Sequence, residues 1–198
     1  MLIIDGHEYT LYKDYDRVSG KYKHLSFLGK VTYLDARVRH ILIDPLRRIA
    51  PDLAQTELGL VFTTAICAGI SAAGTYLKGR RAQPGRDKDS DFFLDFVRAY
   101  MDSGLREPEA DGKTWAEWLY HDVRCGLAHN FTIMKGGIEV QVTQYVELTP
   151  NGPEMNTAHF LEDFAKGWTR YLSDVAAAGS GNGLGLLFEQ RFNEVFND

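Results

Sequence analysis

The stretch RCGLAHN, residues 124–130, closes a predicted helix and runs directly into a segment patterned like β-strands. It places a permanent cation, Arg124, and a titratable imidazole, His129, at the end of that helix. A cation and an imidazole can act together on a phosphate. Because an Arg-to-His spacing also occurs by chance, its interpretation depends on the residues around it.

The preceding residues predict the helix that carries this stretch. Thr114 and Glu117 have the spacing of a capping box, in which the threonine hydroxyl accepts a backbone N–H and the glutamate reaches back to the cap. Apolar side chains then recur at helical spacing: Trp115, Trp118, Leu119, Val123 and Leu127. Gly126 falls inside this stripe and would let a neighbouring element approach closely. We therefore predict a helix over residues 114–129.

The residues after this helix have the alternating pattern of strands. Phe131 and Ile133 alternate with polar residues, and Gly136-Gly137 suits a two-residue hairpin turn. The return strand has apolar side chains on one face: Ile138, Val140, Val142, Val146 and Leu148. We predict a β-hairpin over residues 131–148, followed by a turn at Asn151-Gly152-Pro153.

Most of the remaining chain has the pattern of helices. Further helices are predicted over these ranges: 30–50 with an interruption near Pro45, 54–79, 91–102, 156–177 and 184–196. Residues 1–29 form an N-terminal segment in which Ile4-Asp5-Gly6, followed by Tyr9 and Leu11, indicates a short hairpin. The predicted fold class is therefore mainly α, a helical bundle over residues 30–198 with a β-hairpin inserted after residue 130.

Length and cysteine usage narrow the class of protein. A chain of 198 residues suits one domain and can bury roughly 70% of its unfolded surface, so it needs no disulfide or metal for stability. Cys67 and Cys125 lie in separate predicted helices, and the sequence opens without a basic, apolar leader. These features predict a reducing, cytoplasmic location.

The net charge of −5 argues against an extended basic surface for nucleic acid, but it allows a small local phosphate site. Basic residues do cluster, in the loop over 80–90 and on the helix over 30–50. In the loop, Arg80, Arg81 and Arg86 are candidate contacts for phosphate or RNA. The alternative is an ordinary solvated surface.

One apolar segment has the length of a membrane span. Residues 58–77 carry no charge and number about 20, which is long enough to cross a bilayer. Much of the segment is Ala, Gly, Ser and Thr, so its transfer into lipid is marginal. We interpret it as the central helix of a bundle, with small residues that let neighbouring helices or a partner subunit pack closely. We expect no membrane association.

The run Arg124-x-Gly-Leu-x-His129-Asn130 at a helix end resembles the signature of the HEPN superfamily, small helical bundles marked by Arg, four to six residues, then His. The resemblance implies a metal-independent endoribonuclease of stress response or defence, such as a toxin, with no cofactor. It also implies a symmetric homodimer with the active site at its interface, and an antitoxin or other protein partner. Arg124, His129 and Asn130 are then the catalytic residues. Other members are non-catalytic domains that bind a nucleotide, RNA or a protein, and that alternative stays open.

The chemistry of Arg124 and His129 suits RNA cleavage without a metal. An imidazole with a pKa of about 6.5 can transfer protons at the ribose 2′-OH and the leaving 5′-oxygen. A guanidinium can hold the phosphate and meet its developing charge. Because positions five apart lie about 140° apart around a helix, one chain's pair would diverge. A composite site across a two-fold axis would remove this difficulty.

Both residues also have interpretations without a ligand. His129 falls at the edge of the apolar stripe, where a hydrogen-bonded core histidine is plausible. Arg124 lies on the polar face, where it could be a surface arginine or pair with Glu117 or Asp122.

Three nearby residues are candidates for supporting roles. Asp122 could orient an imidazole or cap a neighbouring backbone. His121 and Cys125 share a stripe with His129, but three ligands over two turns cannot close round one ion without help, so we expect no metal site. Cys125 stands where the family often has a polar residue. As a nucleophile it would lack an evident oxyanion hole, which disfavours hydrolase chemistry.

Overall fold

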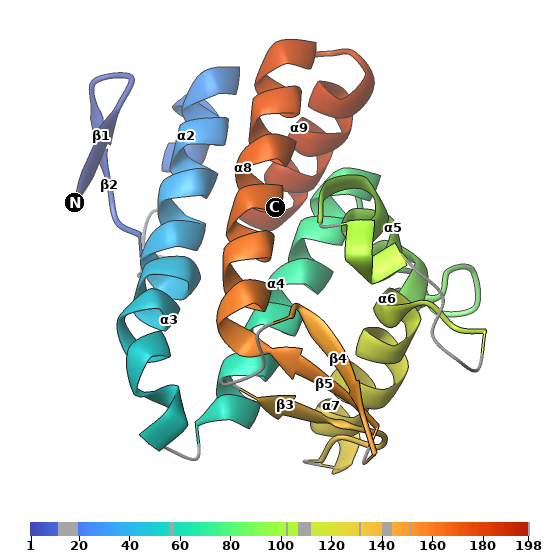
Figure 1. Ribbon diagram of the computed structural model, residues 1–198. Coiled ribbons are helices and arrows are strands. Elements are labelled where there is room, and N and C mark those ends of the chain that lie inside the picture. Colours follow the sequence, from blue (N-terminus) through green and yellow to red (C-terminus); the bar gives the residue numbers. More distant parts are fainter. Residues whose placement is uncertain are drawn as a thin grey trace.

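Helices dominate the part of the chain that the structure, a computed structural model, describes (Figure 1). The described ranges are 1–11, 20–55, 58–101, 103–106, 112–130, 132–139, 144–150 and 152–197. Within them, a two-stranded sheet lies at the N-terminus and a three-stranded sheet lies against one end of the helices. The predicted mainly α fold class with a small β element is confirmed.

The predicted N-terminal hairpin is present. β1 (Leu2–Ile4) pairs antiparallel with β2 (His7–Tyr9) across a two-residue turn with positive φ. Tyr9 is buried, and the centre of its ring lies 5.8 Å from that of Tyr22 and 5.7 Å from that of Tyr33. These aromatic contacts hold the hairpin against the first long helix.

That first helical stretch consists of α2 (Phe27–Val38), a π-helical turn (Arg39–Ile43) and α3 (Asp44–Ile49). Pro45 stands in the first turn of α3, where a missing N–H is tolerated. The π-helical turn directly before it widens the helix. This is the interruption that the sequence predicts near Pro45.

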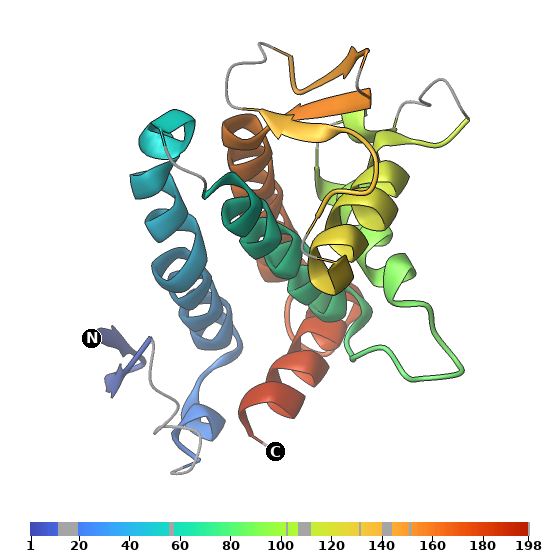
Figure 2. The same ribbon diagram turned by 90° about the horizontal axis from the view of Figure 1, so that it is seen from below.

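α4 (Gly59–Lys78) is the central helix. It packs against α5 (Asp89–Tyr100), α8 (Thr157–Ala178) and α9 (Gly183–Phe196). Figure 2 shows it between α2 on one side and α7 (Cys125–Asn130) on the other. The interpretation of this apolar segment as a bundle helix agrees with these contacts.

Only one face of α4 is buried. Phe62, Ile66 and Ile70 are fully buried on it. The opposite face exposes Val61, with 65% of its surface accessible, and small residues such as Ala68. Among the described helices, α4 alone is long and apolar enough to cross a membrane by length and composition. Its packing against three other helices is compatible with a soluble protein.

The helix predicted over residues 114–129, which we call the motif helix, is confirmed as one continuous helical stretch. It comprises α6 (Trp115–Trp118), a π-helical segment (Leu119–Arg124) and α7. The capping box is also confirmed, because Thr114 Oγ1 accepts the Glu117 N–H at 3.2 Å and the Glu117 carboxylate accepts the Thr114 N–H at 2.8 Å. The π-helical segment directly before α7 was not predicted.

The hairpin predicted over residues 131–148 is wrong. The strands are β3 (Gly137–Glu139), β4 (Val146–Thr149) and β5 (Gly152–Asn156). β4 and β5 form an antiparallel hairpin, and β3 pairs in parallel with β5, which gives the order β3-β5-β4. The hairpin turn therefore lies between β4 and β5, where the sequence predicts only a turn; Asn151, Phe131 and residues 140–143 lie outside the described residues.

Contacts with the motif helix explain the difference. The Trp118 indole donates a hydrogen bond to the Lys135 carbonyl at 2.7 Å, and the Met134 N–H donates to the Asp122 carbonyl at 2.9 Å. A Cβ at Gly126 would collide with the Thr132 carbonyl oxygen, so the glycine permits this close approach as predicted. Residues 132–136 are thus held against the helix and do not form a strand.

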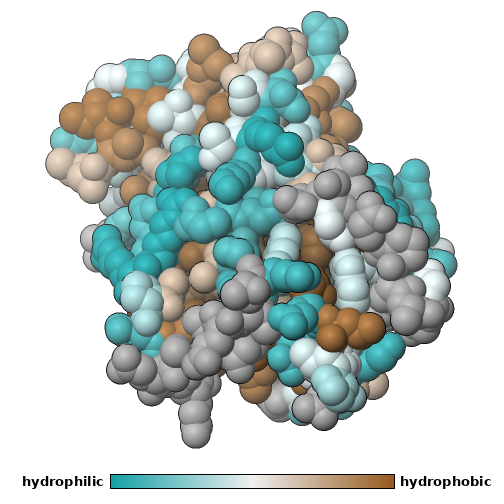
Figure 3. Space-filling model, viewed as in Figure 1, coloured by the Kyte–Doolittle hydropathy of each residue, from teal (hydrophilic) through white to brown (hydrophobic). Residues whose placement is uncertain are grey.

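The face of the molecule seen in Figure 3 is largely hydrophilic over its centre. Hydrophobic side chains gather at its upper left, around the N-terminal hairpin, where Met1 and Ile3 are exposed.

Candidate functional site

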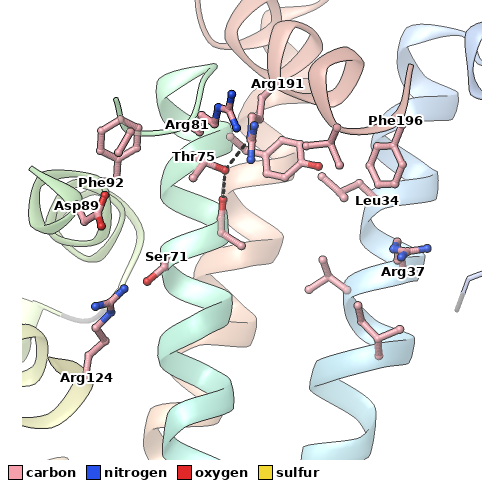
Figure 4. Close-up of a pocket in the computed structure, with 16 residues that line it drawn as sticks. Leu34, Arg37, Ser71, Thr75, Arg81, Asp89, Phe92, Arg124, Arg191 and Phe196 are labelled. Atoms are coloured by element: carbon pink, nitrogen blue, oxygen red, sulfur yellow. Dashed lines mark hydrogen bonds between the residues drawn. The ribbon is translucent and has the colours of Figure 1, made fainter. Parts of the chain in front are cut away.

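Arg124 ends the π-helical segment, and its half-buried side chain points toward α4, beside Ser71 and Asp89 (Figure 4). The guanidinium carbon lies 5.4 Å from the centre of the Tyr120 ring, and Nη1 lies 3.9 Å from the Cys125 sulfur. The ring stabilises the cation electrostatically without neutralising it. The guanidinium is therefore positioned with its charge directed into a cavity.

Arg124 has no carboxylate within ion-pair distance among the described residues. The expected alternative partner Glu117 instead caps the motif helix, and one of its oxygens lies 3.9 Å from Arg98. A guanidinium without a carboxylate partner keeps donors for a bidentate anion. Arg124 thus has the setting of a phosphate ligand rather than of a structural ion pair.

His129 and Asn130 end α7 and are both exposed. The alternative of a core histidine is therefore not what the structure shows. The imidazole is accessible to a ligand that approaches from solvent.

The cavities that Arg124 lines do not include His129 among their described lining residues. Ala128, next to His129, lines the smaller of them against α4. Arg124 closes the π-helical segment, and His129 lies five residues later in α7, so the divergence expected for an ideal α-helix stays a prediction.

The three supporting candidates have different settings. His121 is exposed, with its ring edge-on to Tyr120 at 5.1 Å between centres. Asp122 binds the neighbouring backbone through its carbonyl, which accepts the Met134 N–H; its carboxylate oxygen Oδ2 is buried and has no partner among the described residues. Cys125 is a half-buried free thiol beside Arg124.

The second thiol, Cys67 on α4, is fully buried. Burial raises the pKa of Cys67 to about 12, so the thiol is protonated and unreactive at neutral pH. Within the described ranges, no three His, Cys, Asp or Glu side chains lie where they could share a metal ion.

A cavity of about 600 Å³ opens beside Arg124. Arginines from four separate segments line it: Arg37 on α2, Arg81 after α4, Arg124 before α7 and Arg191 on α9. Ser71 and Thr75 on α4 contribute hydroxyls, and Asp89 is the only carboxylate among the described lining residues. Figure 4 shows Arg81 and Arg191 together at the end of the cavity away from Arg124.

Two neighbouring side chains hold Arg191 in place. Its side chain is only 17% exposed, Nε donates to the Thr75 hydroxyl at 3.0 Å and Nη1 lies 2.7 Å from Glu194. Arg81 is 79% exposed, and its Nε lies 3.5 Å from the same Glu194. One carboxylate is thus shared by two guanidinium groups.

The other two loop arginines lie elsewhere. Arg80 pairs with Asp87, with Nη2 2.8 Å from Oδ1, and its guanidinium lies 5.5 Å from the centre of the Phe92 ring. This pairing holds the pKa of Asp87 well below its usual range. Arg86 is exposed and does not line the described cavity. Of the three loop candidates, only Arg81 reaches the cavity.

Two smaller cavities continue along α4. One of about 270 Å³ is lined by Ser71 and Arg124, which it shares with the large cavity. The other, of about 360 Å³, is almost entirely apolar and includes Ile41 and Ala68. Together the three cavities lie along one side of α4, and we call this surface the α4 groove. Its floor consists of Thr64, Ala68, Ser71, Ala72 and Thr75.

Sequence reasoning identified Arg124 and Arg81 but missed Arg37 and Arg191 as site residues. Arg37 lies in the basic cluster on the helix predicted over residues 30–50, for which the sequence offers an ordinary solvated surface as the alternative. Arg191 could have been noticed because it is the single cation on α9, a helix that also carries the buried Phe188, Phe192 and Phe196.

The described groove offers guanidinium donors, hydroxyls and small side chains, with an exposed imidazole at the end of the neighbouring helix. Such groups can bind a phosphate and move a proton next to it. Comparisons with models of protein families, with curated proteins and with solved structures give no match.

Proposed function

We propose that this protein is a metal-independent endoribonuclease of the HEPN type that acts as a homodimer in stress response or defence. The observation that carries the proposal is the setting of Arg124. Its guanidinium faces an arginine-lined groove and has no carboxylate partner among the described residues. The exposed His129 on the next turns of the same helix supplies the second group that the chemistry needs.

Each group has one role in the reaction. Arg124 binds the scissile phosphate through paired N–H donors and stabilises the charge that develops on it. His129 takes the proton from the ribose 2′-OH, whose oxygen attacks phosphorus while the bond to the 5′-oxygen breaks. The leaving 5′-oxygen takes up that proton from the His129 imidazolium, which returns the imidazole to its neutral form and gives a 2′,3′-cyclic phosphate and a free 5′-hydroxyl. Asn130, the exposed residue after His129, would hydrogen-bond the substrate.

An exposed apolar surface supports the proposed pairing of two copies of the chain. Leu60 and Val61 are exposed at the N-terminal end of the α4 groove, next to small residues that allow close helix packing. Ile41, which is 50% exposed, extends this apolar surface. A symmetric contact there would place the motif helices of two chains near one axis. Arg124 of one chain would then meet His129 of the other.

A different observation favours the alternative, a non-catalytic domain that binds a nucleotide, RNA or a protein. The four arginines converge on the large cavity, whereas His129 does not line it. A binding domain needs only the cavity.

RNA cleavage by the purified protein in EDTA separates the two functions. We expect Arg124→Ala and His129→Ala each to lose cleavage by about 100-fold or more, because each removes a group acting in the transition state. Arg48→Ala and His159→Ala are matched controls, since both residues are exposed on other helices. An intact wild type that cleaves no RNA in a broad panel would favour the binding domain.

A further inference from the structure

We propose that the C-terminal end of the α4 groove is a second phosphate subsite, in which Arg191 and Arg81 hold a phosphate of the strand whose scissile linkage lies at Arg124. The inference rests on the proposed function, because the strand it places there is the RNA substrate. Beyond the proposed function, the inference specifies that the RNA substrate is a single strand that runs along α4.

Arg191 has hydrogen-bond donors that the described part of the protein does not use. A guanidinium has five N–H donors, and in the described structure two of them serve Thr75 and Glu194. Only 17% of the side chain is exposed, yet none of its nitrogens is among the buried polar atoms without a partner, so its remaining donors reach solvent at the cavity, where a phosphate oxygen can replace water. Arg191 is therefore held in place by two contacts and keeps donors for a third.

The local charge carries the second step. The protein has a net charge of −5, yet four arginines and one aspartate line this cavity. Glu194 balances only part of the charge of Arg81 and Arg191, because the two share it. Such a concentration of positive charge in an acidic protein fits a local anion site.

The spacing along α4 carries the third step. Arg191 is bonded to Thr75, and Arg124 lies beside Ser71, one helical turn earlier. A helical turn rises about 5.4 Å, so the two guanidinium positions follow one another along the groove floor. Ser71 and Arg124 also belong to the next cavity, so the groove continues past them. Successive cation positions in a continuous groove suit a strand with repeated phosphates.

Binding of an uncleavable oligonucleotide tests the subsite directly. The probe is a fluorescein-labelled six-nucleotide 2′-O-methyl RNA, with affinity read by anisotropy at several salt concentrations. Arg81→Glu should weaken binding about 5-fold or more and lower the slope of log Kd against log salt by about 0.7 for the lost phosphate contact. Arg191→Gln should weaken binding about 10-fold or more, because its charged hydrogen bonds are partly buried.

Arg48→Glu is the matched control, because it makes the same change in net charge at an exposed position away from the groove. Arg81 is so exposed that its replacement should leave the fold intact, which thermal melting checks. The Arg81→Glu result therefore stands even where Arg191→Gln fails to fold. Equal affinities for Arg81→Glu and Arg48→Glu would overturn the subsite.

Adenosine monophosphate and inorganic phosphate, each titrated against the labelled probe, identify the source of the phosphate. A strand subsite predicts that the effect of Arg81→Glu grows from a two-nucleotide to a six-nucleotide probe. Arg81-dependent binding of the mononucleotide, with no dependence for the six-nucleotide probe, would assign the cavity to a free nucleotide and refute the strand. Because the probe cannot be cleaved, its binding is measured independently of RNA cleavage. If binding of the probe depends on Arg81 but the wild-type protein cleaves no RNA, the proposed nuclease is refuted and the phosphate subsite is retained.

Discussion

The Nε of Arg191, on the last helix, donates a 3.0 Å hydrogen bond to the hydroxyl of Thr75, on the central helix. Thr75 donates its own proton to the Ala72 carbonyl at 2.7 Å, so its oxygen is oriented toward the guanidinium. A residue 116 positions away in sequence is thereby fixed over the floor of the α4 groove. The hydrogen bond between Arg191 and Thr75 therefore makes the positive charge in the cavity depend on the packing of α9 against α4.

Replacing Thr75 tests whether this contact positions Arg191. Thr75→Val keeps the shape of the side chain and removes the acceptor, so we expect affinity for the uncleavable oligonucleotide to fall by about 3-fold, with a change in stability near 1 kcal/mol. Thr75→Ser keeps the hydroxyl and should retain wild-type affinity. If Thr75→Val binds as tightly as Thr75→Ser, the hydrogen bond has no role in binding.

The capping box of the motif helix should make stability depend on pH. The Thr114 backbone N–H, through its hydrogen bond to the carboxylate, lowers the pKa of Glu117 below its unfolded value of about 4.3. A lowered folded-state pKa means that the stabilisation is present above about pH 5 and is lost as pH falls through the folded pKa. Glu117→Gln should therefore lower the melting temperature at pH 7 and have less effect at pH 3.5.

The expected size of this effect is small, because the Glu117 side chain is one-third exposed and solvent screens it. A loss of about 0.5 kcal/mol corresponds to about 1–2 °C in a protein of this length. Thr114→Ala removes the reciprocal half of the box and also the hydrogen bond from the Thr114 hydroxyl to the Glu117 carboxylate, so it should cost about 1 kcal/mol at pH 7 and somewhat less at pH 3.5. An equal Glu117→Gln effect at both pH values would show that the carboxylate charge has no part in capping.

Gly126, the one glycine of the motif, should not be replaceable without moving the neighbouring segment. A Cβ there would collide with the Thr132 carbonyl oxygen, so Gly126→Ala must displace the segment that the Met134 N–H fixes to the helix. We expect a loss of about 1–3 kcal/mol in the free energy of unfolding, measured by urea titration. Gly137→Ala is the matched control, because its Cβ would meet the nearest side-chain atom, of Glu154, at an ordinary 3.6 Å. Equal losses in the two variants would contradict the steric argument.

The features predicted correctly from sequence are local ones. The capping box and the apolar stripe of the motif helix depend on residues within a few turns of one another, and the N-terminal hairpin depends on one short turn. The misplaced hairpin depends on distant contacts. β3 pairs in parallel with β5, and the hydrogen bond from Trp118 to Lys135 holds the intervening loop. Alternation of side chains indicates a strand but not its partner.

The same distinction applies to the site. Arg124 was predicted from its own helix, whereas the cavity forms only where Arg37, Arg81 and Arg191 arrive from segments far apart in the chain. Arg191 is the single cation of α9, but the local pattern does not reveal which residues of other segments lie beside it. The carboxylate partner of each arginine, or the lack of one, is likewise a property of the folded chain.

Mixed dimers give the sharpest test of the composite site. Positions five apart diverge around an ideal α-helix, and His129 does not line the cavities of Arg124, so we expect a working pair to take one residue from each chain. Arg124→Ala and His129→Ala proteins should each be inactive alone. After the subunits are exchanged, half of the dimers are mixed, and one of the two sites in each mixed dimer contains both residues. Cleavage should then recover to about one quarter of the wild-type rate. If the pair worked within one chain, every mixed dimer would stay inactive, and mixing would restore nothing.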